Sequence, residues 1–263
     1  MSNSNLTILK RYATGDPNSL PSSVLFQFSD KFMTIFDAYP KSIFHFLILP
    51  RVVEGGDFSA VELKNLKTLL KGDKEKAKQL VEAFQSEAQN VKKQIEEEMT
   101  ERYGFKWDVW IGFHAVPSME HLHLHVLSAD MCSEKMKNKK HYNSFHPSKG
   151  FFLHINDVLD WFEATPGYYQ QVTKLDPKAY EALLKEGLTC WKCGSEMKNI
   201  PSLKEHLQEE WNKQESRSRR TAAKRKVVEG HSGSNPKEKQ ANSGDEIPAK
   251  KRKGDPDLTQ SND

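Results

Sequence analysis

Three histidines alternate with aliphatic residues in the segment HLHLHVLS, at His121, His123 and His125. If residues 121–128 form a β-strand, the period of two places the three imidazoles on one face and sends the residues between them into a core. Crowded imidazoles repel one another when protonated, so the arrangement is costly unless it has a use. A coincidental run on a surface strand is therefore the least favoured explanation.

Two kinds of chemistry fit this segment. Alternate histidines on a strand can bind zinc, as in three-histidine sites. Alternatively, a neutral imidazole can attack phosphorus while its neighbours fix its tautomer and supply a proton. The preceding turn, HAVPSMEH, brings His114 and Ser118 near the same place, and its backbone amides could hold phosphate oxygens.

A second set of residues predicts a metal site. Cys190 and Cys193 form a CxxC pair, followed by His206 and Glu210. The two-residue gap lets both thiolates reach one ion, and His206 and Glu210, four apart, share a helix face. This spacing is typical of a structural zinc finger, with Glu209 as the competing fourth ligand. A redox role for the pair is disfavoured because the βαβ context is missing.

Composition limits the class of protein. The chain has 263 residues, 37% hydrophobic and 29% charged, with a net charge of +3. Three cysteines, two of them in CxxC, favour a reducing compartment over a disulfide framework. The N-terminus lacks the apolar core of a signal peptide, and no apolar run is long enough for a membrane span. We therefore expect a soluble, monomeric intracellular protein with no membrane partner.

The hydrophobic pattern predicts an α+β fold, with an antiparallel sheet and flanking helices. We expect a short helix near LTILKRY and a capping box at Ser59 and Glu62. The predicted strands are 24–28, 32–37, 43–50, 107–114 and 121–128, with a strand or loop at 150–155. The predicted helices are 58–70, a longer one at 73–102, and a short one near 156–163.

The chain divides into predicted regions by composition. A catalytic domain occupies 23–165, a small zinc finger 178–213, and a low-complexity tail without aromatic residues 214–263. We expect the tail to be disordered. Its basic clusters, at 216–227 and 249–253, predict nuclear import signals or DNA-binding arms.

The motifs together resemble a known family. The pattern His-φ-His-φ-His-φ-φ, where φ is apolar, resembles the histidine triad family of nucleotide hydrolases and transferases. FDAYPKSIFHFLILP is similar to its upstream nucleotide-binding segment. GFHAVPSMEHLHLHVLSADM followed by KNKKHYNSF is closer still to the aprataxin branch, which hydrolyses 5′-adenylated DNA. The resemblance covers about residues 24–210 and implies a histidine triad fold.

The resemblance implies roles for the histidine pocket. His123 would be the nucleophile that takes up AMP, and His114 would act on the leaving group or position the phosphate. His121 and His125 would orient His123 and contact phosphate, and Ser118 would hydrogen-bond the leaving side.

The resemblance also implies contacts with nucleotide and DNA. Asp37 would hold the ribose, Tyr39 and Lys41 would flank the base and the DNA end, and Lys137 and Lys140 would contact DNA phosphate. Residues 1–22 would meet the DNA end, with Leu9 and Tyr12 as candidate wedge residues. We expect His45 to be a packing residue.

The implied function is removal of AMP from 5′-adenylated DNA at nicks or single-strand breaks, through an AMP–histidine intermediate. RNA–DNA junctions are further substrates. Zinc would be structural, with Cys-Cys-His-Glu ligands like those of some fungal members, and the chemistry itself would need no metal. We expect the nucleus, and also the cytoplasm, as the location, and no forkhead-associated module before the catalytic segment. The alternatives are a general histidine triad hydrolase of small adenylylated molecules and an inactive zinc-finger DNA-binding adaptor.

Overall fold

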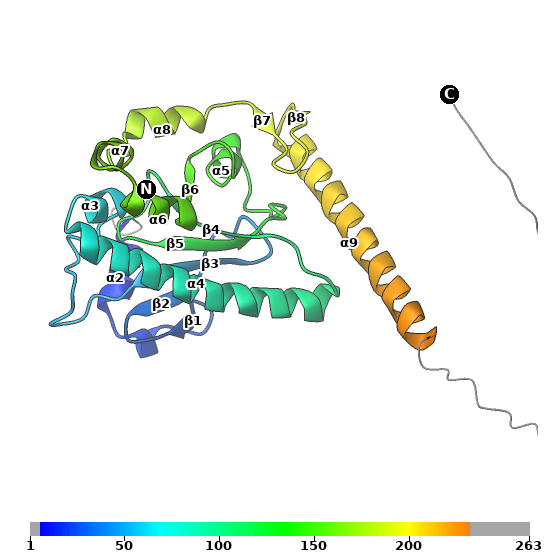
Figure 1. Cartoon of the computed structure of the whole chain (residues 1–263), viewed down its shortest axis with the longest axis horizontal. Helices are drawn as coiled ribbons and strands as arrows, with labels where there is room; N and C mark the ends of the chain where they lie inside the picture. The colour runs from blue at the N-terminus through cyan, green and yellow to red at the C-terminus, as the bar shows by residue number, and fades with distance from the viewer. Residues whose placement is uncertain (1–5, 232–263) are drawn as a thin grey trace, which may run out of the picture. The chain divides into compact units, whose positions relative to one another are not determined.

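A computed structural model describes residues 6–231, with side chains to residue 221. Its central feature is a six-stranded antiparallel sheet, and the antiparallel arrangement was predicted (Figure 1). The strand order is β1-β2-β3-β5-β4-β6. The strands are β1 (Leu25–Phe28), β2 (Phe32–Phe36), β3 (His45–Pro50), β4 (Val109–His114), β5 (Leu124–Ser128) and β6 (Phe152–His154). The basic cluster at 249–253 lies outside the described residues.

One face of the sheet is covered by the long helix α4 (Lys74–Tyr103). This helix begins where the Asp73 side chain accepts from the Lys76 N–H, and it ends at Gly104, whose φ of 77° suits glycine. Its apolar stripe, which includes Val81 and Phe84, packs with Ile48 of β3 and with the alternate residues of β5. Leu122, Leu124 and Val126 therefore enter this core, as the strand pattern predicts.

The opposite face of the sheet carries the candidate sites. Helix α2 (Ile8–Thr14) packs Leu9 and Ala13 onto β2 and β3. Farther along this face, Leu127 of β5 joins a cluster that includes Cys190 and residues of the C-terminal region. The elements there are α5 (Lys139–Asn143), β7 (Leu188–Thr189), β8 (Glu196–Met197) and α9 (Ile200–His231).

The helix predicted at 58–70 is shorter than expected: only α3 (Leu66–Leu70) is helical there. The capping box does form, since the Ser59 N–H donates to Glu62 at 2.8 Å. It caps no α-helix, because the carbonyls of Leu63 and Lys64 accept from the backbone N–H groups of residues 122 and 121. A new helix start then follows at Asn65, whose side chain accepts from the Thr68 N–H.

Four further short helices complete the fold. The predicted helix at 156–163 appears as α6 (Ile155–Glu163), which is followed by α7 (Pro166–Val172) and α8 (Pro177–Leu183). A 3-10 turn (Pro17–Ser19) follows α2.

Helix α9 extends past residue 213, where we expected disorder to begin. A charged segment that cannot build a core can still form a solvated helix through pairs four residues apart, such as Glu215 with Arg219 at 2.7 Å. Among the described residues, neither α9 nor any other helix combines the length and apolar character of a membrane span.

Candidate active site and metal centre

Only the last of the three alternating histidines lies in a strand. β5 begins at Leu124, so the predicted strand at 121–128 is too long at its start. His121 has a φ of 95°, a left-handed conformation that costs about 1–3 kcal/mol in a non-glycine residue. Its N–H donates to Lys64 at 3.0 Å, and its ring Nε2 lies 2.8 Å from the Pro50 carbonyl. These contacts hold the strained backbone in place.

His123 is buried and has a defined tautomer. Its Nδ1 lies 2.7 Å from the backbone carbonyl of His121. A carbonyl only accepts, so Nδ1 carries the proton and donates, which leaves the Nε2 lone pair free in the neutral ring. Burial lowers the pKa of His123 and so favours that neutral form.

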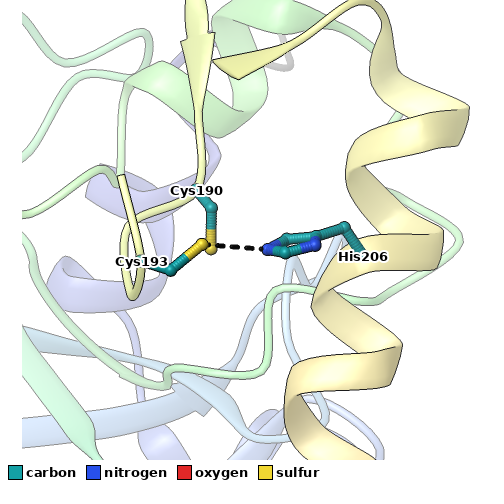
Figure 2. A group of neighbouring side chains, drawn as sticks. All are labelled: Cys190, Cys193 and His206. Atoms are coloured by element: carbon teal, nitrogen blue, oxygen red, sulfur yellow. Dashed lines mark hydrogen bonds between the residues drawn. The ribbon is translucent and has the colours of Figure 1, made fainter. Parts of the chain in front are cut away.

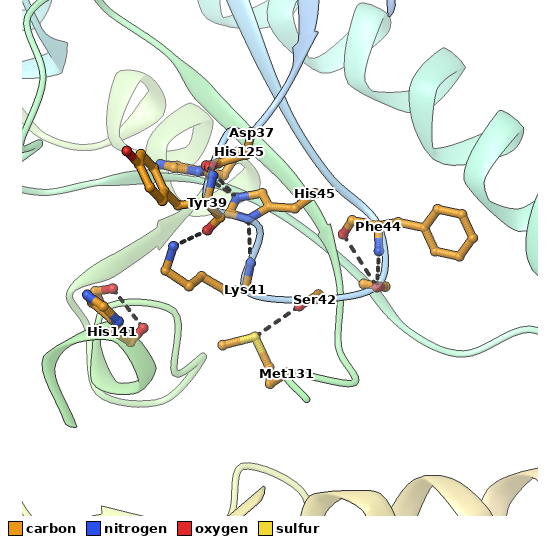
Figure 3. Close-up of polar contacts among 11 residues, drawn as sticks. Asp37, Tyr39, Lys41, Ser42, Phe44, His45, His125, Met131 and His141 are labelled. Carbon is orange, nitrogen blue, oxygen red and sulfur yellow. Dashed lines mark hydrogen bonds and ion pairs between the residues drawn. The ribbon is translucent and has the colours of Figure 1, made fainter. Parts of the chain in front are cut away.

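A chain of hydrogen bonds also orders His45 and His125 (Figure 3). The Lys41 N–H donates to His45 Nδ1 at 3.1 Å, so the His45 proton is on Nε2. That nitrogen lies 3.0 Å from Nδ1 of His125 and 3.5 Å from the Asp37 carboxylate. The His125 proton therefore sits on Nε2, a buried atom with no partner among the described residues.

His45 is thus more than the packing residue that we expected. It is fully buried, but it links the Asp37 loop to His125. Its signal in the sequence was a single basic residue inside the apolar strand at 43–50.

His114 completes the pocket from β4. Its ring centroid lies 4.4 Å from that of His125, and its Nε2 is buried without a partner among the described residues. Burial lowers the pKa of His114 and of His125 well below 6.5, and the neighbouring imidazoles lower both further. Burial also lowers the pKa of His45 and of His121 to about 4. The imidazoles of the pocket are therefore neutral near pH 7.

The predicted nucleotide-binding residues lie on one loop at the edge of this pocket. Asp37 accepts from the Tyr39 N–H at 2.7 Å, and the Lys41 ammonium donates to the Tyr39 carbonyl. The Tyr39 side chain is free to meet a ligand, since the residue is 67% exposed. Burial lowers the pKa of Lys41, and Asp37 opposes that shift.

Residues at the end of β5 and directly after it hold this loop through hydrogen bonds, and we did not predict their role. Asp130 accepts from the Ile43 N–H at 3.0 Å, and Ser128 accepts from the Phe44 N–H at 3.1 Å. Met131 accepts from the Ser42 hydroxyl. A buried acid directly after a strand was the available signal, in the sequence LSADM.

The remaining predicted contact residues differ in how exposed they are. Ser118 is exposed in the loop between β4 and β5, and Lys137 and Lys140 are exposed at α5. Of the two wedge candidates, Tyr12 is partly buried on α2, whereas Leu9 is 2% exposed and packs against the sheet. Leu9 is therefore not free to contact a ligand.

The cysteine pair forms a knuckle that meets α9 (Figure 2). The Gly194 N–H donates to the Cys190 carbonyl, and the Cys190 N–H to the Ser195 carbonyl, both at 2.8 Å. The ligand atoms of Cys190, Cys193 and His206 all lie within 4.8 Å of one another.

These three residues fit zinc, since a pair of sulfurs and an imidazole nitrogen converge at the spacing of one coordination sphere. The Ser195 hydroxyl lowers the pKa of Cys193 to about 7, toward the thiolate that a metal binds. The predicted fourth ligand, Glu210, stands outside this cluster and accepts from the Lys213 ammonium at 2.9 Å. Glu209 is exposed on the same helix.

A second group, Asp37, His45 and His125, also has ligand atoms within 4.8 Å of one another. Here the same atoms already bond to each other, as the 3.0 Å contact between the two imidazoles shows. We interpret this group as a hydrogen-bonded chain.

The fold and both sites were compared with known proteins. Residues 8–141 match the family described as scavenger mRNA decapping enzyme C-term binding, and residues 148–213 match the C2HE / C2H2 / C2HC zinc-binding finger. A solved structure of Hnt3 in complex with DNA and guanosine is 29% identical, with a TM-score of 0.60 over 80% of this chain and 97% of that one. Another, of the aprataxin ortholog Hnt3 in complex with DNA, is 28% identical with a TM-score of 0.58, over 81% of this chain and 96% of that one.

Curated relatives agree with this likeness. The aprataxin-like protein of Saccharomyces cerevisiae is 31% identical over 78% of this chain and 94% of its own length. Aprataxin of Danio rerio is 35% identical over 68% of this chain, which spans 47% of that protein; the match to aprataxin of Ciona intestinalis spans 40% of that relative.

The chain is a histidine triad protein with an added zinc-finger segment. Three features define this class: the antiparallel sheet, the histidine pocket and the C-terminal finger. Within that superfamily, the chain belongs to the aprataxin family.

Proposed function

We propose that this protein removes AMP from 5′-adenylated DNA ends and restores the 5′-phosphate. The observation that carries the proposal is the tautomer of His123: Nδ1 is tied to the His121 carbonyl at 2.7 Å, so Nε2 is free to attack phosphorus. Solved relatives 28–29% identical to this chain hold DNA, and one of them also holds guanosine.

The reaction has two steps in this proposal. His123 Nε2 attacks the α-phosphorus of the adenylate, and the bond from that phosphorus to the bridging oxygen breaks. DNA leaves with its 5′-phosphate, and AMP stays on His123 through a P–N bond. Water then attacks the same phosphorus, breaks the P–N bond and releases AMP, while His123 regains its neutral form.

Neighbouring residues act on the phosphate. The unpartnered Nε2–H of His125 is a buried donor suited to a phosphate oxygen. His114, with its own buried and unpartnered Nε2, would position the phosphate or act on the leaving group, with Ser118 on the leaving side. His121 would orient His123 through its backbone carbonyl. The imidazoles and lysines would stabilise the negative charge on the phosphate oxygens. We therefore propose that this chemistry needs no metal.

The two ends of the substrate would meet different parts of the surface. Asp37 would hold the ribose, with Tyr39 and Lys41 beside the base and the DNA end. Lys137 and Lys140, exposed at α5, would contact DNA phosphates. Cys190, Cys193 and His206 would hold a structural zinc, with Glu210 as the fourth ligand after release from Lys213. We propose a monomer located in the nucleus, acting at nicks, single-strand breaks and RNA–DNA junctions.

The test compares two substrates with purified full-length protein. Nicked DNA carrying a 5′-adenylate is resolved on a gel, and adenosine phosphoramidate is assayed separately. Turnover of the DNA far above that of the phosphoramidate supports the proposal. Fast phosphoramidate turnover with intact adenylated DNA would identify a general nucleotide hydrolase. DNA binding without turnover of either substrate would identify an adaptor.

A further inference from the structure

We propose that residues 142–146, the end of α5 and the turn that follows it, couple the cysteine knuckle to the histidine pocket. The Tyr142 hydroxyl is the positioning group, and this segment is called the turn below. The inference rests on the proposed function, since the pocket is taken to bind AMP. It concerns how two sites in one chain influence each other, and it makes Tyr142 a residue that acts on the reaction through its neighbours.

The Tyr142 hydroxyl brackets Cys190. It donates to the Thr189 carbonyl and accepts from the Trp191 N–H, both at 2.9 Å, so it bonds the residues on each side of that cysteine. Tyr142 is wholly buried. Its hydroxyl therefore uses both of its hydrogen-bonding roles on the knuckle backbone, with no water to replace either bond.

Two further side chains of the turn hold the segment that leads into the knuckle. Asn143 donates to the carbonyls of Leu184 at 3.3 Å and Glu186 at 3.0 Å. His146 Nε2 lies 3.4 Å from the Thr189 hydroxyl. Hydrogen bonds thus tie residues 142, 143 and 146 to the segment 184–191.

The same turn also contacts the histidine pocket. The Phe145 ring lies 4.5 Å from His114, 5.1 Å from His125 and 5.2 Å from His45, between ring centroids. Phe145 therefore packs against the pocket, while residues 142, 143 and 146 bond the knuckle segment.

Coupling between the sites follows from this shared turn. A knuckle that is ordered by its metal holds Tyr142, which fixes Phe145 against the imidazoles. Because coupling of binding free energies is reciprocal, AMP in the histidine pocket should also slow loss of the metal from the knuckle. A small adenylate that never reaches the knuckle would still depend on it.

The test uses Tyr142→Phe, with Tyr169→Phe as the matched control. Tyr169 also donates a hydroxyl hydrogen bond, to the Leu70 carbonyl at 3.1 Å, but it lies on α7 away from the knuckle. Zinc release to a chelator is timed with and without saturating AMP, and kcat and KM are measured on adenosine phosphoramidate.

We expect AMP to slow zinc release by about threefold or more in wild type and Tyr169→Phe, and to have no effect in Tyr142→Phe, since coupling of this kind is typically about fivefold or larger. We also expect kcat on the phosphoramidate to fall about threefold to tenfold in Tyr142→Phe, with KM changed less, the size expected for lost hydrogen bonds.

Phe145→Leu provides a second variant that leaves the knuckle bonds in place. It should keep its zinc and lose the effect of AMP on zinc release. If zinc release from the wild type is the same with and without AMP, or if AMP still slows zinc release in Phe145→Leu, the coupling is overturned. The release measurement needs no turnover, so a wild type that hydrolyses neither substrate removes the proposed reaction and leaves the coupling to be decided by AMP alone.

Discussion

The histidine pocket and the cysteine knuckle are built in opposite ways. Pocket residues such as His45 and His125 belong to the central strands and are almost wholly buried, so the core itself positions them. The knuckle lies between two strands of two residues each, and Cys193 is exposed. The pocket is therefore organised before any ligand arrives, whereas we expect the knuckle to be ordered by its ion.

The sharpest challenge to this contrast is removal of the proposed nucleophile, His123. His123→Ala should lower the single-turnover rate on adenylated nicked DNA by about 10³-fold or more, because no other imidazole has its Nε2 in the same place. DNA affinity should change little. His154→Ala, which removes the histidine that caps α6, is the control. If His123→Ala keeps activity within tenfold of wild type, His123 is not the nucleophile.

Removal of a predicted metal ligand tests whether the cysteine knuckle binds zinc. Cys190→Ser should lower zinc affinity by more than about 100-fold, since even partners of metal ligands contribute 10–100-fold. Metal analysis after gel filtration checks this, and Cys132→Ser is the matched control because burial raises the pKa of Cys132 to about 12. Equal zinc content in both variants would remove the assigned metal site.

Acid should lower the free energy of unfolding of the ligand-free protein, because His45 is buried in its neutral form. Burial lowers the pKa of His45 to about 4 from 6.5, so the unfolded chain binds more protons than the folded chain between these values. The stabilising contribution is present above pH 6.5 and is lost as the pH falls toward 4. His45 alone should reduce the free energy of unfolding by about 2 kcal/mol between pH 7.5 and pH 5.

Urea unfolding at the two pH values measures this change. His45→Asn should show a correspondingly smaller pH dependence than wild type. Identical pH dependence in wild type and His45→Asn would show that His45 does not carry it.

The smallest expected effect concerns the exposed lysines. Lys137→Ala and Lys140→Ala should each weaken DNA binding several-fold and reduce the slope of log affinity against log salt by about 1. Lys93→Ala, on a side chain of α4 that is 79% exposed, is the control. A slope unchanged by both substitutions would place the DNA on another surface.

Local patterns predicted the sheet well, because alternating apolar residues and one long helical stripe have few ways to bury themselves. The strand at 121–128 was predicted too long, since His121 takes a backbone conformation that only distant partners stabilise. For the same reason the roles of His45, Asp130 and Tyr142 were not predicted: each depends on contacts with residues 47 to 87 positions away. No local pattern encodes such partners.

The connection between β3 and α3 has a consequence for protein engineering. Its tip, residues 54–57, is exposed and would accept an inserted peptide tag. Six residues beyond this tip, the carbonyls of Leu63 and Lys64 set the backbone of residues 121 and 122. An insertion near residue 63 would therefore disturb the backbone that leads to His123, from a part of the chain far away in sequence.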